Sequence, residues 1–295
     1  MPGLLIIEIA HCAAAFPLPA SLASLSKIFT FTTTIMSEMN PPTTPWTSFL
    51  KMLRTMILEE LLQDGCSVAR YAAVCRDWQA IIEKKTFSRI TITPRRLASF
   101  GTMILRNIKL VKYIWLCVQL QEYDCLQCEQ EESEEWHTEN NIIIERAIRD
   151  LFLVLSTWPS GEELVLDISV HSPSDTKHHF KNLHIGSDAA SKLDYEENTT
   201  TDRSHGWVNG KQVNGPSEHS VNRLFGEIEM DDGFWQTVPH VTAVSKLLLR
   251  RQSRYRWTGE TIAELLKVVP QLQSIVWEPW REWSGLIQRM ADRGT

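Results

Sequence analysis

Apolar residues recur at helical spacing on both sides of a break at Asp64-Gly65, in the first third of the chain. After the break, Ser67 can cap a second helix. These spacings predict two short helices joined by a tight turn. The same pattern is typical of a generic helical hairpin that packs on the rest of a protein. The apolar positions before and after the break are Phe49, Leu53, Met56, Ile57, Leu61 and Leu62, then Val68, Tyr71, Ala72, Cys75 and Ile82.

Beyond Phe87 the pattern becomes one of short strands alternating with helices. Ile90 and Ile92 alternate as in a strand, and Thr93-Pro94 then supplies an N-cap and a proline at the first helical position. The next strand is expected over residues 111–120. Two further helix-then-strand units follow. Their apolar positions are Ile144, Ile148, Leu151 and Leu155 before Leu164, Leu166, Ile168 and Val170, and Ile262, Leu265, Leu266 and Val269 before Leu272, Ile275 and Trp277.

A partial internal repeat lies near the C-terminal end. Pro239, Val241 and Val244 align in frame with Pro270, Leu272 and Ile275. A proline followed by apolar residues two and five positions later is typical of the residues that lead into the strand of a leucine-rich repeat. The copies are spaced slightly further apart than regular repeats. The chain is therefore predicted to be α/β, with an irregular leucine-rich-repeat-like region. An α/β sheet of another topology is the alternative.

These patterns divide the chain into three parts. Residues 1–45 are expected to be a leader without ordered structure, ending in a Pro-rich linker at residues 40–45. Residues 46–92 form the helical module. Residues 93–290 form the α/β region, with a loop insertion at 171–233 in which Asn, Ser, Thr, Asp and Gly dominate. The first 35 residues carry neither a basic n-region nor a run long enough to span a bilayer. Either a disordered leader or a start at Met36 is preferred over a weak transit peptide.

Composition narrows the class of protein. The net charge of -6 argues against a nucleic-acid partner. Six Cys at irregular spacings in 295 residues favour a reducing compartment, either cytoplasm or nucleus, over a secreted disulfide framework. No membrane partner is expected. The Thr-rich stretch at Asn198 matches a glycosylation sequon, which has no meaning in the cytosol.

Cysteine and histidine residues raise the question of a metal. Cys125 and Cys128 have zinc-knuckle spacing, with Cys117 before them and His137 after them. A single Cys-x-x-Cys lacks the second pair of a strong zinc signal, so free thiols beside the acidic loop 129–135 are preferred. The adjacent His178-His179 is interpreted as a loop pair. Neither a metal nor a cofactor is therefore predicted.

No catalytic motif is recognisable either. The chain holds no nucleophile elbow, no phosphate-binding loop and no dinucleotide fingerprint, so it is not predicted to be an enzyme. Arg250, Arg251, Arg254 and Arg256 alternate with Tyr255 and Trp257, as in some single-strand binders. The acidic chain around them favours the exposed end of a strand instead.

The stretch from Ile57 to Trp78, ending in Val74-Cys75-Arg76-Asp77-Trp78, resembles the middle and end of an F-box. Further segments carry a broader resemblance, over most of residues 50–290, to the F-box-like family of filamentous fungi. They are Phe87 to Leu97, Tyr113 to Cys117 with Glu122 to Cys125, Leu166 to Asp175, and Trp277 to Trp283.

This resemblance implies a substrate receptor with no catalytic residue of its own. Its F-box binds a Skp-type adaptor on a cullin scaffold, and its C-terminal region captures a protein for ubiquitination. Trp277, Trp280 and Trp283 would be partner-binding residues, since Trp is enriched in binding hot spots. The alternative is that these rings close the core. The implied adaptor-binding residues are Ile57, Leu58, Leu61, Val74, Cys75 and Trp78.

One departure concerns the start of the module. An F-box opens with a Leu-Pro pair before the Ile-Leu, whereas residues 49–56 contain no proline. The second hypothesis is therefore a structural or interaction protein with a decayed F-box and no link to a ligase.

Overall fold

The computed structural model divides the chain into two units, Met1–Thr86 and Phe87–Thr295. It describes residues 56, 72–73, 76–161, 163–183, 201–228, 230, 232–250 and 255–278. In the first unit the described residues belong mainly to helix α4 (Arg76–Ser88), which continues into the start of the second unit. Ile82 of this helix is buried and Trp78 is half-buried. The leader 1–45 and the predicted first helix, except Met56, lie outside the described residues.

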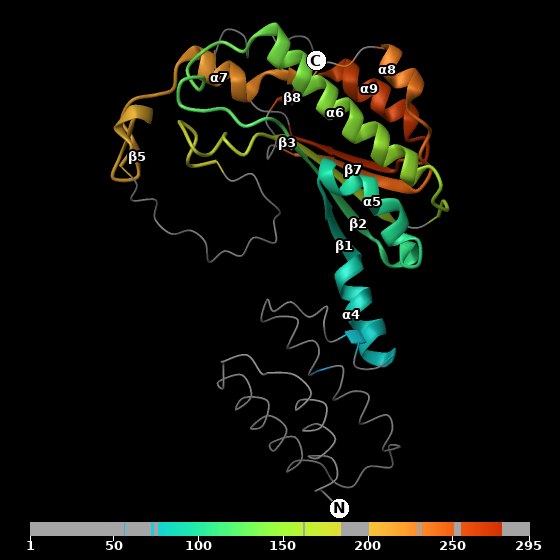
Figure 1. Cartoon of the computed structure of the whole chain (residues 1–295). Coiled ribbons are helices and arrows are strands. Elements are labelled where there is room, and N and C mark those ends of the chain that lie inside the picture. The colour runs from blue at the N-terminus through green and yellow to red at the C-terminus, as the bar shows by residue number, and fades with distance from the viewer. Residues whose placement is uncertain are drawn as a thin grey trace, which may run out of the picture. The chain divides into compact units, whose positions relative to one another are not determined.

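The second unit is built on a sheet of five parallel strands (Figure 1). The strands lie in the order in which they occur along the chain, so each new strand is added beside the previous one. They are β1 (Arg89–Ile92), β2 (Tyr113–Gln119), β3 (Leu164–His171), β7 (Val244–Leu249) and β9 (Ser274–Trp277). One register row crosses the whole sheet and is apolar throughout: Ile90, Ile114, Leu166, Leu247 and Ile275.

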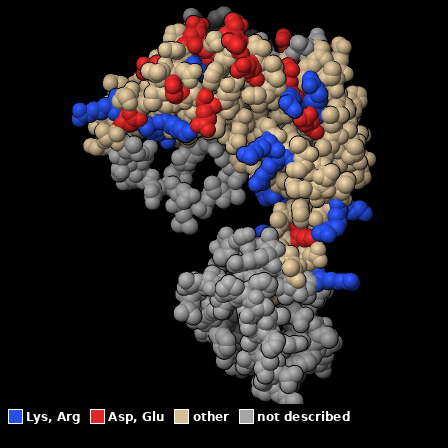
Figure 2. Space-filling model, in the orientation of Figure 1, with Lys and Arg blue, Asp and Glu red and all other residues tan. Residues whose placement is uncertain are grey.

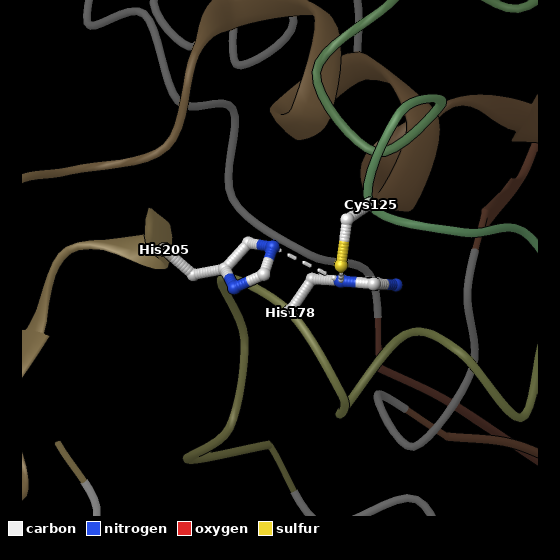
Figure 3. A group of neighbouring side chains, drawn as sticks. All are labelled: Cys125, His178 and His205. Atoms are coloured by element: carbon white, nitrogen blue, oxygen red, sulfur yellow. Dashed lines mark hydrogen bonds between the residues drawn. The ribbon is translucent and has the colours of Figure 1, made fainter. Parts of the chain in front are cut away.

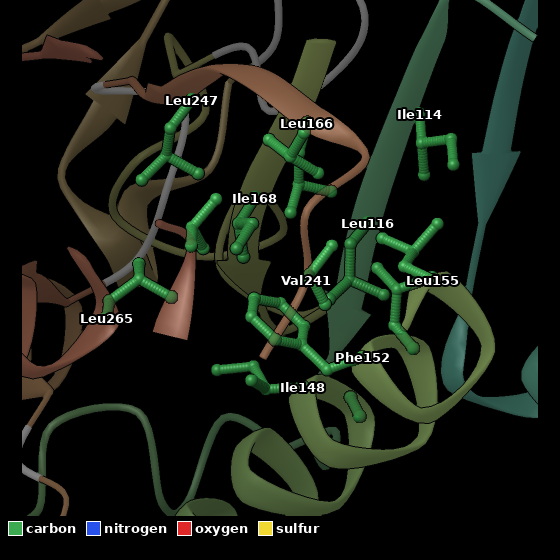
Figure 4. Packing of buried hydrophobic residues seen from close by; sticks show 14 of the residues in the cluster. Ile114, Leu116, Ile148, Phe152, Leu155, Leu166, Ile168, Val241, Leu247 and Leu265 are labelled. Atoms are coloured by element: carbon green, nitrogen blue, oxygen red, sulfur yellow. The ribbon is translucent and has the colours of Figure 1, made fainter. Parts of the chain in front are cut away.

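Four helices cover one face of this sheet: α5 (Pro94–Ile104), α6 (Glu134–Leu155), α8 (Asp232–Thr237) and α9 (Gly259–Val268) (Figure 1). Figure 4 shows Ile148, Phe152 and Leu155 of α6 directed toward Leu116 and Ile168 of the sheet. Parallel strands need such crossover helices, and burying one face of the sheet against them removes apolar area from water.

The predicted helix starts are largely confirmed. Pro94 is the first residue of α5 and Thr93 occupies its N-cap position, but the Thr93 side chain makes no capping hydrogen bond. The Thr258 hydroxyl caps α9 by accepting from the Thr261 N–H at 3.2 Å. Helix α6 begins at Glu134, earlier than its apolar stripe predicted, because its first two turns are polar. Ser133 caps it, accepting from the Trp136 N–H at 3.2 Å. Residues 134 and 135 are thus helical and not part of a loop.

The stretch 171–233 has more regular structure in its described parts than its composition indicated. It contains a short 3₁₀ turn η3, two strands that form a hairpin, a capped helix and a strand that pairs with β8 (Arg256–Trp257). Their bounds are η3 (Arg203–His205), β4 (Trp207–Val208), β5 (Lys211–Gln212), α7 (Glu218–Phe225) and β6 (Glu227–Ile228). A second 3₁₀ turn, η2 (Ile108–Leu110), precedes β2.

The internal repeat leads into two neighbouring strands, but it is not kept in register. Sequence alignment places Val244 against Ile275, whereas the sheet pairs Leu247 with Ile275. The described part of the chain is a mixed α/β unit on a parallel sheet, without a regular leucine-rich-repeat solenoid. Among its helices, none combines the length and the apolar character needed to cross a bilayer.

Candidate functional site

The loops that follow β2 and β3 leave the sheet at the same edge and are hydrogen-bonded to each other. Ser174 Oγ accepts from the Tyr123 N–H at 3.1 Å, and the Asp175 carboxylate accepts from the Tyr123 hydroxyl at 3.0 Å. The Ser172 hydroxyl donates to the Gln121 carbonyl oxygen at 2.6 Å. Adjacent parallel strands end side by side, so the loops that follow them are neighbours. The hydrogen bonds between the two loops replace those that their buried polar groups would otherwise make to water.

Cys125 is held in a turn that belongs to the first of these loops. Asp124 Oδ1 accepts from the backbone N–H groups of Leu126 at 2.8 Å and Gln127 at 3.0 Å, as in an Asx turn. The Cys128 N–H donates to the Asp124 carbonyl oxygen at 3.0 Å, and the Cys128 thiol donates to the Cys125 carbonyl oxygen at 3.3 Å. The Cys-x-x-Cys spacing thus forms a closed turn.

A third segment, residues 201–214, reaches the same place from much later in the chain. Asp202 and Trp207 exchange two backbone hydrogen bonds of 2.8 Å, which close a turn around His205. Gly206 adopts a φ of +76° there, and a Cβ at this position would lie 2.1 Å from the Asn214 carbonyl oxygen. Only glycine therefore fits this turn. Trp207 Nε1 donates to the His179 carbonyl oxygen at 3.0 Å, which joins this segment to the loop after β3.

These three segments bring together one thiol and two imidazoles (Figure 3). The Cys125 Sγ lies 3.7 Å from the His178 Nδ1, and the His178 Nδ1 lies 3.1 Å from the His205 Nε2. All three atoms lie within 4.8 Å of one another. Both histidines are buried, while Cys125 is exposed. We call these three residues the Cys-His-His cluster.

The partners of the two imidazoles fix which ring nitrogens carry hydrogen. The His178 Nε2 lies 3.3 Å from the Tyr123 carbonyl oxygen, which can only accept, so this nitrogen is the donor. The His205 Nδ1 lies 2.8 Å from a carboxylate oxygen of Asp202 and donates to it. In the neutral rings, the two nitrogens that face each other inside the cluster are then both acceptors.

Charges around the cluster keep these roles in place. The Lys181 ammonium, 2.6 Å from Asp202, holds the pKa of that carboxyl well below its usual range, together with the hydroxyl of Ser204. Burial lowers the pKa of His178, and the neighbouring His205, His179 and Lys181 lower it further. Burial also lowers the pKa of His179, whose Nε2 lies 3.1 Å from Glu129. Asp202 is therefore ionised at neutral pH, and the surroundings of His178 favour its uncharged form.

The cluster differs from the set of ligands that sequence spacing suggested. Cys128 is buried in the turn but is not part of the cluster. Cys117 lies on β2, with its Sγ 3.7 Å from the His171 Nδ1, and His137 lies on α6 against the ring of Tyr255. The residues that join Cys125 are His178, taken from the sequence as half of a loop pair, and His205, which carried no sequence signal.

A ladder of cross-strand pairs lies on the face of the sheet opposite the helices. Strand residues alternate between faces, so the odd-numbered residues of β2 and β3 point away from the core. The Asp167 carboxylate accepts from both the Tyr113 hydroxyl and the Arg250 guanidinium, and the Trp115 Nε1 donates to the Ser169 Oγ at 2.7 Å. Cys117 and His171 form a third pair between β2 and β3. In each of the three pairs the two residues are 54 positions apart in the sequence.

Cys117 on this ladder is expected to resist alkylation. Burial raises the pKa of its thiol to about 11. The reactive thiolate fraction at pH 8 is then roughly 0.1%, about 100-fold below that of a thiol with a pKa of 9.0. Mass spectrometry of peptides after iodoacetamide treatment should show the Cys117 rate rising about tenfold per pH unit. A rate at pH 8 equal to that of the same thiol in the urea-unfolded chain would contradict this expectation.

The predicted adaptor-binding and partner-binding residues are only partly described. Trp78 lies in the first turn of α4 and is half-buried. Ile57, Leu58, Leu61, Val74 and Cys75 lie outside the described residues. Trp277 is the last residue of β9 and is 43% exposed. Trp280 and Trp283 lie outside the described residues.

The charged segments also differ in part from expectation. Acidic side chains gather over the start of α6, where Glu129, Glu131, Glu134 and Glu135 are exposed (Figure 2). Glu132 is the exception, because it accepts from the Arg223 guanidinium at 3.1 Å and from the Tyr255 hydroxyl at 2.6 Å.

The sequence favoured the exposed end of a strand for the basic cluster, but the two described arginines are only partly exposed and both form ion pairs. Arg250 binds Asp167, and Arg256 lies 2.8 Å from Glu227. Arg251 and Arg254, like the sequon at Asn198, lie outside the described residues.

Comparison with protein-family models, with curated proteins and with solved structures gave no match to this chain.

Proposed function

We propose that this chain is an F-box-like substrate receptor. Its N-terminal module would bind a Skp-type adaptor on a cullin scaffold, and its α/β region would capture the protein to be ubiquitinated. The observation that carries this proposal is the sequence of residues 57–78, which resembles an F-box up to Trp78. The division of the chain at Thr86 supports it, since a receptor needs a docking module and a separate capturing unit.

The capturing unit is proposed to be a degenerate leucine-rich-repeat-like region. In such arrays every repeat adds one strand beside the last, so the strand order follows the chain and the helices lie on one face. The order β1-β2-β3-β7-β9 agrees with that rule. The long segment between β3 and β7 and the shifted register of the last two strands are departures from a regular array.

Adaptor capture by the full chain tests the docking proposal. The adaptor, without the cullin, should co-purify with the wild-type chain. Trp78→Ala or Leu58→Asp should weaken adaptor binding about 30-fold or more, as substitution of a hot-spot residue does. Binding can be measured by surface plasmon resonance with purified adaptor. Trp277→Ala is the matched control, since it removes the same ring from an exposed position outside the module.

Two outcomes separate the hypotheses. Loss of adaptor binding in the Trp78 and Leu58 variants, with the Trp277 variant unchanged, would support the receptor. An adaptor that fails to bind the wild-type chain at micromolar concentration would contradict it.

A second candidate is a non-catalytic interaction protein with a decayed F-box and no ligase link. The observation that favours it is the exposed indole of Trp277 on β9, next to the Trp-rich end of the chain. Under this hypothesis Trp277→Ala would reduce recovery of protein partners from cell extract, and no adaptor would be recovered with the wild-type chain.

A further inference from the structure

We propose that Cys125, His178 and His205 bind a zinc ion as three of its four ligands. The site belongs to the α/β unit alone and does not depend on the proposed adaptor binding. It would join three segments that lie far apart in the sequence: the turn after β2, the loop after β3, and the 201–214 segment. A thiolate with two imidazoles is a ligand set typical of zinc in proteins.

The distances within the Cys-His-His cluster fit a tetrahedral ion. With zinc bonds of ordinary length, the edges of the tetrahedron are about 3.3 Å between two nitrogens and about 3.6 Å between sulfur and nitrogen. The observed separations are 3.1 Å between the two histidine nitrogens and 3.7 Å between the Cys125 Sγ and the His178 Nδ1. The third edge is bounded by 4.8 Å, so a small rotation of the exposed Cys125 side chain closes the set.

Hydrogen bonding outside the cluster leaves the inner nitrogens free to bind a cation. The only N–H of neutral His178 points to the Tyr123 carbonyl oxygen, and the only N–H of neutral His205 points to Asp202. The two lone pairs then face each other at 3.1 Å in a buried place. A shared metal ion satisfies both lone pairs without an added proton.

Both imidazoles also have the outer partners that metal-bound histidines use. Such histidines donate their second N–H to a carboxylate or a backbone carbonyl, which fixes the ring and raises its basicity. Tyr123 supplies the carbonyl oxygen and Asp202 the carboxylate. Asp202 is itself held by the Lys181 ammonium at 2.6 Å and by the Ser204 hydroxyl at 2.5 Å. Residues that are close only by chance would not be expected to have these outer hydrogen-bond partners.

Zinc content of the untagged full chain tests the proposal directly. After incubation with zinc and extensive dialysis, mass spectrometry of the metal should find about one zinc per chain in the wild type. Cys125→Ser, His178→Gln and His205→Gln should each lower zinc affinity about tenfold or more. The matched controls are Cys117→Ser and the exposed His240→Gln, which alter a thiol and an imidazole outside the cluster and should bind as the wild type does.

Cobalt substitution provides a readout on the wild-type chain itself. Added Co²⁺ should give the wild type a thiolate-to-cobalt charge-transfer band, because Cys125 is one of the ligands. Asp202→Asn, which keeps the side chain but removes its charge, should retain the band while weakening zinc binding about 10- to 100-fold. Circular dichroism identifies any variant that has failed to fold.

Three results would overturn the proposal. The first is a wild-type chain that keeps well under one zinc per chain after incubation with excess metal. The second is cobalt binding without a charge-transfer band. The third is equal zinc affinity in the wild type and in all three folded ligand variants.

Discussion

Phe152→Ala should lower the free energy of unfolding by about 3–5 kcal/mol, the usual cost of removing a large ring from a packed core. Phe152 is fully buried in the last turn of α6, where it faces Leu116 and Ile168 of the sheet (Figure 4). Truncation of the ring removes its contacts with the helix layer and with the sheet. It also leaves a cavity, which the strands and the helix cannot fill because their backbones are held by hydrogen bonds. Urea unfolding followed by circular dichroism measures the change.

The neighbouring Leu153 offers the matched control for this prediction. It lies in the same helical turn but is 52% exposed. Leu153→Ala should therefore change the free energy of unfolding by only about 0.5 kcal/mol. Equal effects of the two substitutions would mean that α6 does not cover the sheet as described.

Asp167→Ala should lower the free energy of unfolding by about 3–5 kcal/mol, because it removes one partner of a buried ion pair. The Asp167 side chain is 2% exposed and accepts from both Arg250 and Tyr113 on the ladder. Its loss removes a carboxylate that contacts the Arg250 guanidinium, which is itself only 14% exposed. Burial and the hydrogen bond to Asp167 hold the pKa of Tyr113 above its ordinary value, and loss of the second cause should lower that pKa in the variant.

A double variant separates the effect of the broken ion pair from that of lost packing. Asp167→Leu with Arg250→Met replaces the pair by apolar side chains and should recover most of the stability lost by Asp167→Ala. Glu264→Ala, which breaks the surface pair with Lys267, should cost no more than about 1 kcal/mol. If Asp167→Ala proves as mild as Glu264→Ala, the ladder does not contribute to stability.

The same sheet that carries this ladder also positions the Cys-His-His cluster. Strands β2 and β3 are paired over seven residues, so their loops leave the sheet together and stay within hydrogen-bonding distance. The cluster is thus a consequence of strand order: inserting another strand between β2 and β3 would separate Cys125 from His178.

Much of the α/β unit could be predicted from the sequence because its signals are local. The alternation of Leu164, Leu166 and Ile168 predicts a strand whatever surrounds it, since side chains of a strand alternate between faces. Thr258 before the stripe of α9 predicts a helix start, since its hydroxyl caps a turn only three residues away. The order and parallel direction of the five strands did not follow from these patterns.

Elements without such periodicity escaped prediction. The early turns of α6 are polar, and η3 with its hairpin has too few residues for any repeating pattern. Their order comes from contacts such as Trp207 with the His179 carbonyl oxygen, which depend on tertiary placement.

The sequence by itself thus determined the strands of the five-stranded sheet, most of the helices that cover it, the Cys-x-x-Cys spacing and the resemblance of residues 57–78 to an F-box. Only the tertiary structure decided which side chains lie next to Cys125. Its neighbours His178 and His205 lie 53 and 80 positions further along the chain, and no spacing rule connects residues across a sheet edge and a turn. Cys117 and His137, the ligands that sequence spacing suggested, are directed elsewhere, because β2 and α6 fix their side chains on other faces.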